Sequence, residues 1–198
     1  METEPRRLDH LKMMNSQASQ NDLKEQHEKA VGDSLLMALG VPHQFIGCGD
    51  PQKQEPDLLY RMGDRCLGVE VTTAYYDNNH SRAEWGAARE NLEPDTKDRM
   101  IMLFAGINPD QRMISSVQDA LRKKGKKVYA GTSSVWLCIQ ARAHLASLDE
   151  MVALVKTLDI PKQSSFERLF LVCHMLLDED SGIRVFDLAS KEAFGCYR

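Results

Sequence analysis

Two acidic residues stand in a stretch that is otherwise suited to a β-hairpin: Asp57 directly follows Pro56, and Glu70 lies between two valines. Burying a carboxylate in so apolar a strand is unfavourable unless something pairs with it. Carboxylates on neighbouring strands suit Mg²⁺, which prefers oxygen ligands and keeps several waters. A bound Mg²⁺ ion can activate water and neutralise negative charge on a phosphodiester. We therefore interpret Asp57 and Glu70 as candidate metal ligands for phosphodiester hydrolysis.

The residues around these acids predict the hairpin that would bring them together. Residues 58–62 form a short apolar run, Gly63-Asp64 supplies a turn, and residues 67–76 are rich in β-branched and aromatic side chains. Side chains alternate between the faces of a strand, so Thr72 would share a face with Glu70. Its hydroxyl could orient a water molecule but brings no positive charge, which must then come from another element.

Helices and strands alternate along the rest of the chain. A capping box from Asp22 to Glu25 predicts the start of a helix that ends at Gly40, and its expected apolar stripe is Val31, Leu35, Ala38 and Leu39. Further elements are expected as a strand at 43–48, a helix after Asn108-Pro109, a strand at 133–140, a helix capped by Ser147, and a closing hairpin at 169–177 and 183–188. The order predicts an α/β or α+β fold with a central mixed sheet flanked by helices.

The helix after Pro109 ends in the dense basic cluster 122–127 and offers the missing cation. Its buried side is expected to carry Ile114, Val117, Leu121 and Val128. Lys124 follows Leu121 by three residues and so continues the same face. Because a lysine stem can cross apolar surface, the Lys124 ammonium could reach the two acids.

The element order and the two acids resemble the PD-(D/E)XK nuclease superfamily, over roughly residues 22–140. The core of that superfamily runs α-β-β-β-α-β, with Pro-Asp opening the second strand and acid-x-Lys in the third. Pro56-Asp57 and Glu70-Val71-Thr72 occupy those places, and Thr72 departs from the usual lysine. Some members look similar in carrying Glu-x-Thr and a lysine-rich helix followed by a tyrosine, and the corresponding residues are Lys123, Lys124, Lys126, Lys127 and Tyr129.

The resemblance implies a restriction-endonuclease-like core, extended here by an extra helix and the C-terminal hairpin. It implies an endonuclease that depends on Mg²⁺, with Mn²⁺ as a substitute and DNA as the expected substrate. The implied metal ligands are Asp57, Glu70 and the backbone carbonyl of Val71. Glu28 from the first helix, Thr72 and Lys124 would complete the catalytic residues.

Each candidate residue also has a purely structural interpretation. Asp57 could be a strand-start residue, Glu70 the salt-bridge partner of an arginine, and Glu28 a solvated helix position. The lysine cluster could simply be a favourable last helical turn. The 6 histidines show no metal-binding spacing, and the 5 cysteines are scattered as expected for reduced thiols in the cytoplasm.

Length and composition bound the remaining possibilities. With 198 residues, 42% of them hydrophobic, the chain predicts one domain at 21–198 after a flexible arm at 1–20. A helical insert at 77–112 is expected to act as a lid, a homodimer contact or a recognition arm. The net charge of −4 leaves room only for a local basic patch on nucleic acid, and no apolar run is long enough for a membrane span. The alternatives are an inactive nuclease-fold protein that binds nucleic acid or a protein partner, and a structural or regulatory subunit whose insert at 77–112 makes the contacts.

Overall fold

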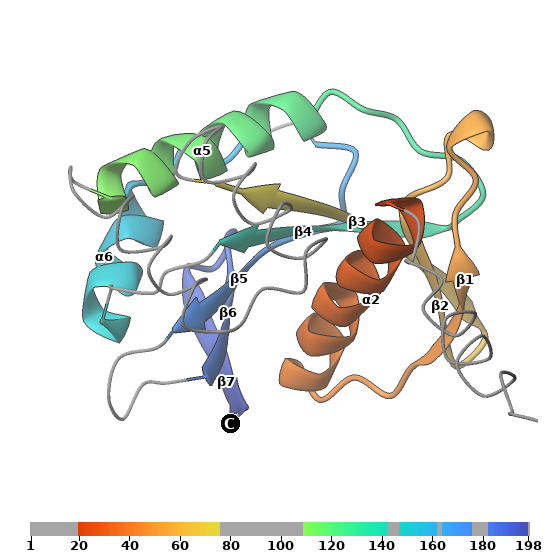
Figure 1. Ribbon diagram of the computed structural model, residues 1–198, viewed down its shortest axis with the longest axis horizontal. Coiled ribbons are helices and arrows are strands. Elements are labelled where there is room, and N and C mark those ends of the chain that lie inside the picture. Colours follow the sequence, from red (N-terminus) through yellow and green to blue (C-terminus); the bar gives the residue numbers. More distant parts are fainter. Residues whose placement is uncertain (1–19, 76–108, 142–146, 162–163, 176–181, 198) are drawn as a thin grey trace, which may run out of the picture.

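The computed structural model describes residues 20–75, 109–141, 147–161, 164–175 and 182–197 (Figure 1). The expected arm at 1–20 lies outside these ranges except for residue 20. The expected insert at 77–112 lies outside them except for residues 109–112, which are helical. The elements are α2 (Gln20–Ala38), β1 (Gln44–Cys48), a 3-10 turn (Pro51–Lys53), β2 (Leu58–Met62), β3 (Arg65–Ala74), α5 (Pro109–Lys124), β4 (Ser134–Ala141), α6 (Leu148–Thr157), β5 (Arg168–Met175), β6 (Gly182–Asp187) and β7 (Glu192–Tyr197). None of the helices in the described ranges is long and apolar enough to cross a membrane.

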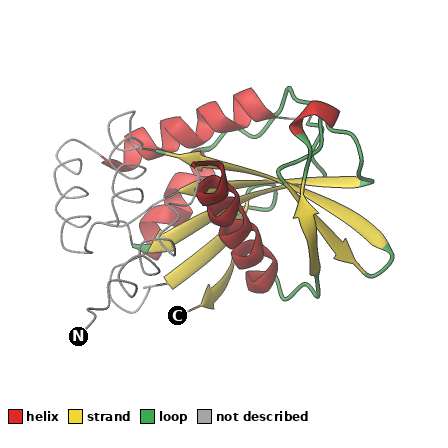
Figure 2. Cartoon of the chain, turned by 45° about the vertical axis from the view of Figure 1, so that its right-hand side comes forward, coloured by secondary structure: helices red, strands yellow, loops and turns green. Residues whose placement is uncertain are grey.

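The seven strands form one mixed sheet in which they follow their chain order from β1 to β7. β4 lies parallel to both β3 and β5, whereas the other neighbouring strands pair antiparallel. Parallel neighbours need crossover connections, and α5 and α6 lie in the two crossovers. Figures 1 and 2 show α5 along one side of the sheet and α2 across the other. The expected mixed α/β architecture is confirmed.

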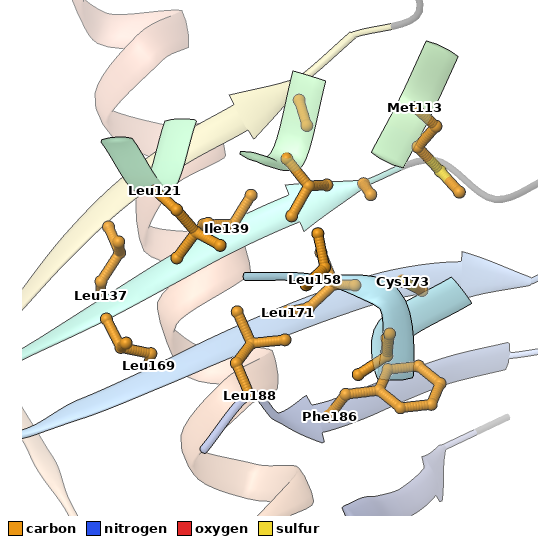
Figure 3. Close-up of a cluster of buried hydrophobic side chains, with 14 of the residues drawn as sticks. Met113, Leu121, Leu137, Ile139, Leu158, Leu169, Leu171, Cys173, Phe186 and Leu188 are labelled. Atoms are coloured by element: carbon orange, nitrogen blue, oxygen red, sulfur yellow. The ribbon is translucent and has the colours of Figure 1, made fainter. Parts of the chain in front are cut away.

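Each face of the sheet is covered by its own hydrophobic core. On one face, α5 and α6 pack on β4 and β5, and Figure 3 shows side chains such as Leu121, Ile139 and Leu171 gathered there. On the other face, α2 packs on a cluster that includes Val69 and Val71 of β3. Because side chains alternate along a strand, Glu70 must face the α5 side. The alternation therefore directs an acid toward the helix that carries the basic cluster.

Two local expectations are wrong, and one strand was not predicted. The helix α2 already includes Gln20, so Asp22 lies inside its first turn and is not an N-cap. Val128 is 75% exposed because α5 ends at Lys124, before the helical stripe could reach Val128. The strand β7, which follows a turn with Lys191 at φ 63°, was not expected. The capping box of α6 is confirmed, since the Ser147 side chain accepts from the backbone N–H of Glu150.

Lys191 fixes the β6–β7 turn to the end of α6. Its Nζ atom donates hydrogen bonds to the backbone carbonyls of Val155 (3.1 Å) and Leu158 (2.9 Å). A cation at a helix C-terminus satisfies unpaired carbonyls and interacts favourably with the helix dipole.

Lys191→Met is therefore expected to lower the free energy of unfolding by about 2 kcal/mol, the scale of hydrogen bonds from a charged group. Urea unfolding measures the change. Methionine keeps most of the apolar stem, and Lys156→Met removes a charge from the exposed last turn of α6 as the matched control. The control should change the unfolding free energy by less than about 0.5 kcal/mol. Equal losses in the two variants would contradict a capping role for Lys191.

Candidate active site

Asp57 lies where β3 loses its antiparallel neighbour. The ladder between β2 and β3 ends at the pair Leu58 and Val69, so the β2 side of β3 is open from Glu70 onward. Asp57 Oδ2 accepts a hydrogen bond from the backbone N–H of Val71 at 2.9 Å. The N–H and C=O of one strand residue face the same neighbour, so the Val71 carbonyl faces this opening as well. The open edge thus brings the Asp57 carboxylate and the Val71 carbonyl to the same side of β3.

Two glycines hold the Pro56-Asp57 segment in place. A Cβ atom on Gly68 would lie 2.3 Å from Cγ of Pro56, and one on Gly49 would lie 2.0 Å from the Pro56 carbonyl oxygen. The Gly49 N–H also donates to the Asp57 carbonyl at 3.1 Å. No side chain fits at these separations, so the backbone approaches closely only because both residues are glycine. Neither glycine was predicted to be part of the site.

Gly68→Ala is expected to displace Asp57. Overpacking of this kind should lower the unfolding free energy by about 1–3 kcal/mol, and a shift of roughly 1 Å in a catalytic group should slow cleavage by about 10²-fold. Gly47→Ala is the matched control, because no atom lies within 4 Å of a Cβ built there. Urea unfolding and cleavage rates measure both effects. Parent-like cleavage by Gly68→Ala would show that the close approach does not position Asp57.

Glu70 is buried, with 2% of its surface exposed, and is paired with two lysines. Its Oε1 atom accepts a hydrogen bond from Lys124 of α5 and one from Lys127 at 3.4 Å. Burial alone would raise the pKa of Glu70, but Lys124, and then Lys127, hold that pKa below its ordinary value. Among the residues described, the charge partners of Glu70 are therefore lysines, not the arginine of the structural interpretation. Lys124 lies where its position on the helix led us to expect it, and its catalytic role stays a prediction.

Glu28 and Asp57 carry negative charge that nearby cations compensate only in part. Glu28 is buried in α2 and pairs with Lys24 at 3.2 Å. Burial, and then the charge of Asp57, raise the pKa of Glu28 to about 7 despite Lys24. Burial and the charge of Glu70 likewise raise the pKa of Asp57 above its ordinary value. The solvated interpretation of Glu28 is wrong, and the three acids influence one another electrostatically.

Two cavities adjoin the acids. The first has a volume of about 400 Å³ and lies among α2, β3 and α5, with Glu28, Asp57, Thr72 and Lys124 in its lining. The second has a volume of about 390 Å³, and its lining includes Asp57, Glu70, Lys127 and Tyr129. Because Asp57 lines both cavities, its carboxylate marks their junction, with Glu28 on the side of the first cavity and Glu70 on the side of the second.

The first cavity also contains polar residues that sequence analysis missed. Lys24 and His27 of α2 line it beside Glu28, and His27 Nε2 lies 3.4 Å from the Thr73 hydroxyl. Thr73 in turn donates to Gln140 of β4 at 3.3 Å. Positions 24, 27 and 28 share one helix face, so their three- and four-residue spacing was the available signal. His27 shows no metal-binding spacing in the sequence, and its place in this cavity is not predicted by it.

The residues at the junction fit a hard divalent cation. Within the described ranges, no three His, Cys, Asp or Glu side chains converge closely enough to form a complete protein cage. Mg²⁺ does not require one, because it binds through one or two carboxylates and keeps several waters. The raised pKa values of Asp57 and Glu28 reflect buried negative charge that such an ion would compensate. Asp57, Glu70 and the Val71 carbonyl are thus a suitable donor set.

No family model, curated protein or solved structure matches this chain. The chemical interpretation therefore depends on the geometry of the site. The carboxylates of Asp57 and Glu70 lie at the open edge of β3, Lys124 is bound to Glu70, and the adjoining cavities could receive a substrate. Such a site can hold a metal ion, bind an anion and admit water.

Proposed function

We propose that this protein is a metal-dependent endonuclease that hydrolyses phosphodiester bonds, with DNA as the first substrate to test. The observation that carries the proposal is the meeting of Asp57, Glu70 and Lys124 at the open edge of β3. The succession α2, β1, β2, β3, α5, β4 is compatible with the restriction-endonuclease-like core suggested by the sequence. We therefore propose that the protein has a restriction-endonuclease-like core.

Each residue of the site has a distinct proposed role. Asp57, Glu70 and the Val71 carbonyl would hold Mg²⁺ or Mn²⁺, which when bound activates water and neutralises charge on the phosphate. The Lys124 ammonium would stabilise the negative charge that develops on the phosphate in the transition state. Thr72 would orient a water molecule through its hydroxyl. Glu28, with a pKa of about 7, could accept a proton from water at neutral pH.

Lys124 would replace the lysine that the resembled family carries at the position of Thr72. Both residues line the first cavity, and the side chain of Lys124 is only 21% exposed. A cation held in a partly buried position acts through less water than a solvated one, so its field at the phosphate is stronger. Nucleic-acid contact would be local, since the chain as a whole has a net charge of −4.

A cleavage screen tests the proposal. The full chain is incubated with single-stranded, double-stranded and branched DNA and with matching RNA, in the presence of Mg²⁺, Mn²⁺ or EDTA. We expect cleavage of DNA with either metal ion and none with EDTA. Binding of nucleic acid without cleavage of any substrate would instead favour an inactive nuclease-fold protein, an alternative compatible with the lysines that already neutralise Glu70.

A further inference from the structure

Lys124 and Lys127 reach the same oxygen of Glu70 from different cavities. Both side chains donate to Glu70 Oε1, yet Lys124 lines the first cavity and Lys127 lines the second. The backbone N–H of Lys127 donates to the Lys124 carbonyl at 2.9 Å, which ties the two residues together in one turn. The Glu70 carboxylate therefore has the Lys124 ammonium on the side of the first cavity and the Lys127 ammonium on the side of the second.

The two cavities offer different chemistry to a substrate. The first contains Glu28 and Thr72, which can accept a proton from water or orient it. The second contains Lys127 and the buried Tyr129 hydroxyl, which lies beside Glu70. The acceptor Glu55 also lines the second cavity, but its carboxylate already receives the Asp50 N–H at 2.9 Å. Lys127 is the one lysine, arginine or histidine among the described residues that line the second cavity, whereas Lys24, His27 and Lys124 line the first. An oxygen that leaves into the second cavity would therefore have Lys127 as its cation.

Phosphoryl transfer requires such a division of space. The attacking and leaving oxygens lie roughly in line on opposite sides of the phosphorus atom. A phosphate held through a metal ion on Asp57 and Glu70, where the cavities meet, would have one oxygen directed into each cavity. The cavity with Glu28 and Thr72 suits the incoming water, and the cavity with Lys127 suits an oxygen that gains negative charge.

On the basis of the proposed nuclease function, we propose that the second cavity receives the departing part of the substrate and that Lys127 stabilises the leaving oxygen. In this step a water oxygen forms a bond to phosphorus, and the bond from phosphorus to the leaving oxygen breaks with its electron pair on that oxygen. One proton passes from the attacking water to solvent, and the leaving oxygen takes one from solvent. The products are a phosphate monoester and an alcohol. Lys127 acts through its positive charge and keeps its own protons.

A change of leaving atom tests this role. The ends of the parent's DNA products identify which bridging oxygen departs, and an oligonucleotide with sulfur at that position then provides a leaving thiolate. A thiolate needs less stabilisation than an alkoxide, because thiols are far stronger acids than alcohols; the cysteine thiol has a pKa of about 8.5. We expect Lys127→Ala to lower kcat on the oxygen substrate by about 10²-fold and on the sulfur substrate by less than about fivefold. Lys124→Ala should slow both substrates by similar factors.

Lys126→Ala is the matched control, because it removes a neighbouring exposed charge from a residue that lines neither cavity. It should leave both rates within about twofold of the parent, as expected for a surface change away from the site. The Lys127 side chain is 56% exposed, so Lys127→Ala should fold, and circular dichroism verifies this. Equal losses of Lys127→Ala on the two substrates, or an equal effect of Lys126→Ala, would overturn the assignment. If the parent cleaves no nucleic acid at all, the proposed function fails and this role falls with it.

Discussion

Replacing Asp57 with asparagine, or Glu70 with glutamine, is expected to abolish Mg²⁺-dependent cleavage while the protein stays folded. Both changes remove a negatively charged metal ligand but keep the shape of the side chain. A metal ion contributes several kcal/mol to catalysis, and about 1.4 kcal/mol corresponds to tenfold, so the rate should fall by at least about 10³-fold. Measured cleavage under saturating Mg²⁺ gives the loss. Asp64→Asn, which changes an exposed acid in the turn of the same hairpin, is the control.

The same variants separate a metal site from a structural ion pair. The pKa of Asp57 is raised in the folded protein, so its ionised form is less favourable there than in the unfolded chain. That stability deficit develops as the pH rises above the ordinary pKa of aspartate, and Asp57→Asn should therefore increase the unfolding free energy at pH 7. Asparagine can still accept the Val71 N–H. Parent-like cleavage by both Asp57→Asn and Glu70→Gln would locate the chemistry elsewhere, and unfolding of Glu70→Gln would favour the ion-pair interpretation.

Removing the Lys124 ammonium is expected to slow cleavage by at least about 10²-fold, the scale of losing one preorganised electrostatic group. Its Nζ atom contacts Glu70 directly, so the charge lies beside the expected phosphate position. Metal affinity should not fall, because lysine is not a ligand and its removal takes a positive charge away from Glu70. Cleavage rates and calorimetric titration with Mn²⁺ measure the two effects for Lys124→Ala.

A charge swap tests the role of Lys124 more sharply. Thr72 lines the same cavity as Lys124, so Thr72→Lys added to Lys124→Ala should return an ammonium to the site and restore part of the lost activity. Thr157→Lys in the same background is the control, because this exposed threonine of α6 lines neither cavity. Equal rates for Lys124→Ala and the parent, or equal rescue by both lysines, would contradict the proposed role.

Much of the site could be predicted because its residues follow local rules. The turn at Gly63 and the alternation along β3 were enough to direct Glu70 toward α5. The three-residue step from Leu121 was enough to direct Lys124 toward the sheet. Side chains repeat at fixed intervals along a strand or a helix, so burial of one face determines which neighbouring residues share that face.

The rest depends on contacts between segments that no local pattern relates. Gly49, just after β1, and Gly68 of β3 both lie against Pro56. The sequence around a glycine does not show which distant segment packs against it. Lys127 lies beyond the end of α5, where helical spacing no longer applies, yet it reaches Glu70. Val128 was wrongly expected to be buried for the same reason. The strand β7 has a short, glycine-interrupted sequence that offers little periodicity.

Locating Mn²⁺ by anomalous diffraction from a crystal soaked in that ion tests the central claim most directly. The account predicts an anomalous peak at the open edge of β3, within about 2.0–2.3 Å of carboxylate oxygens of Asp57 and Glu70, the range expected for a Mg²⁺-type oxygen site occupied by a slightly larger ion. The peak should vanish in a crystal of Asp57→Asn. A peak bound elsewhere on the chain, with the junction of the two cavities empty at saturating Mn²⁺, would contradict it.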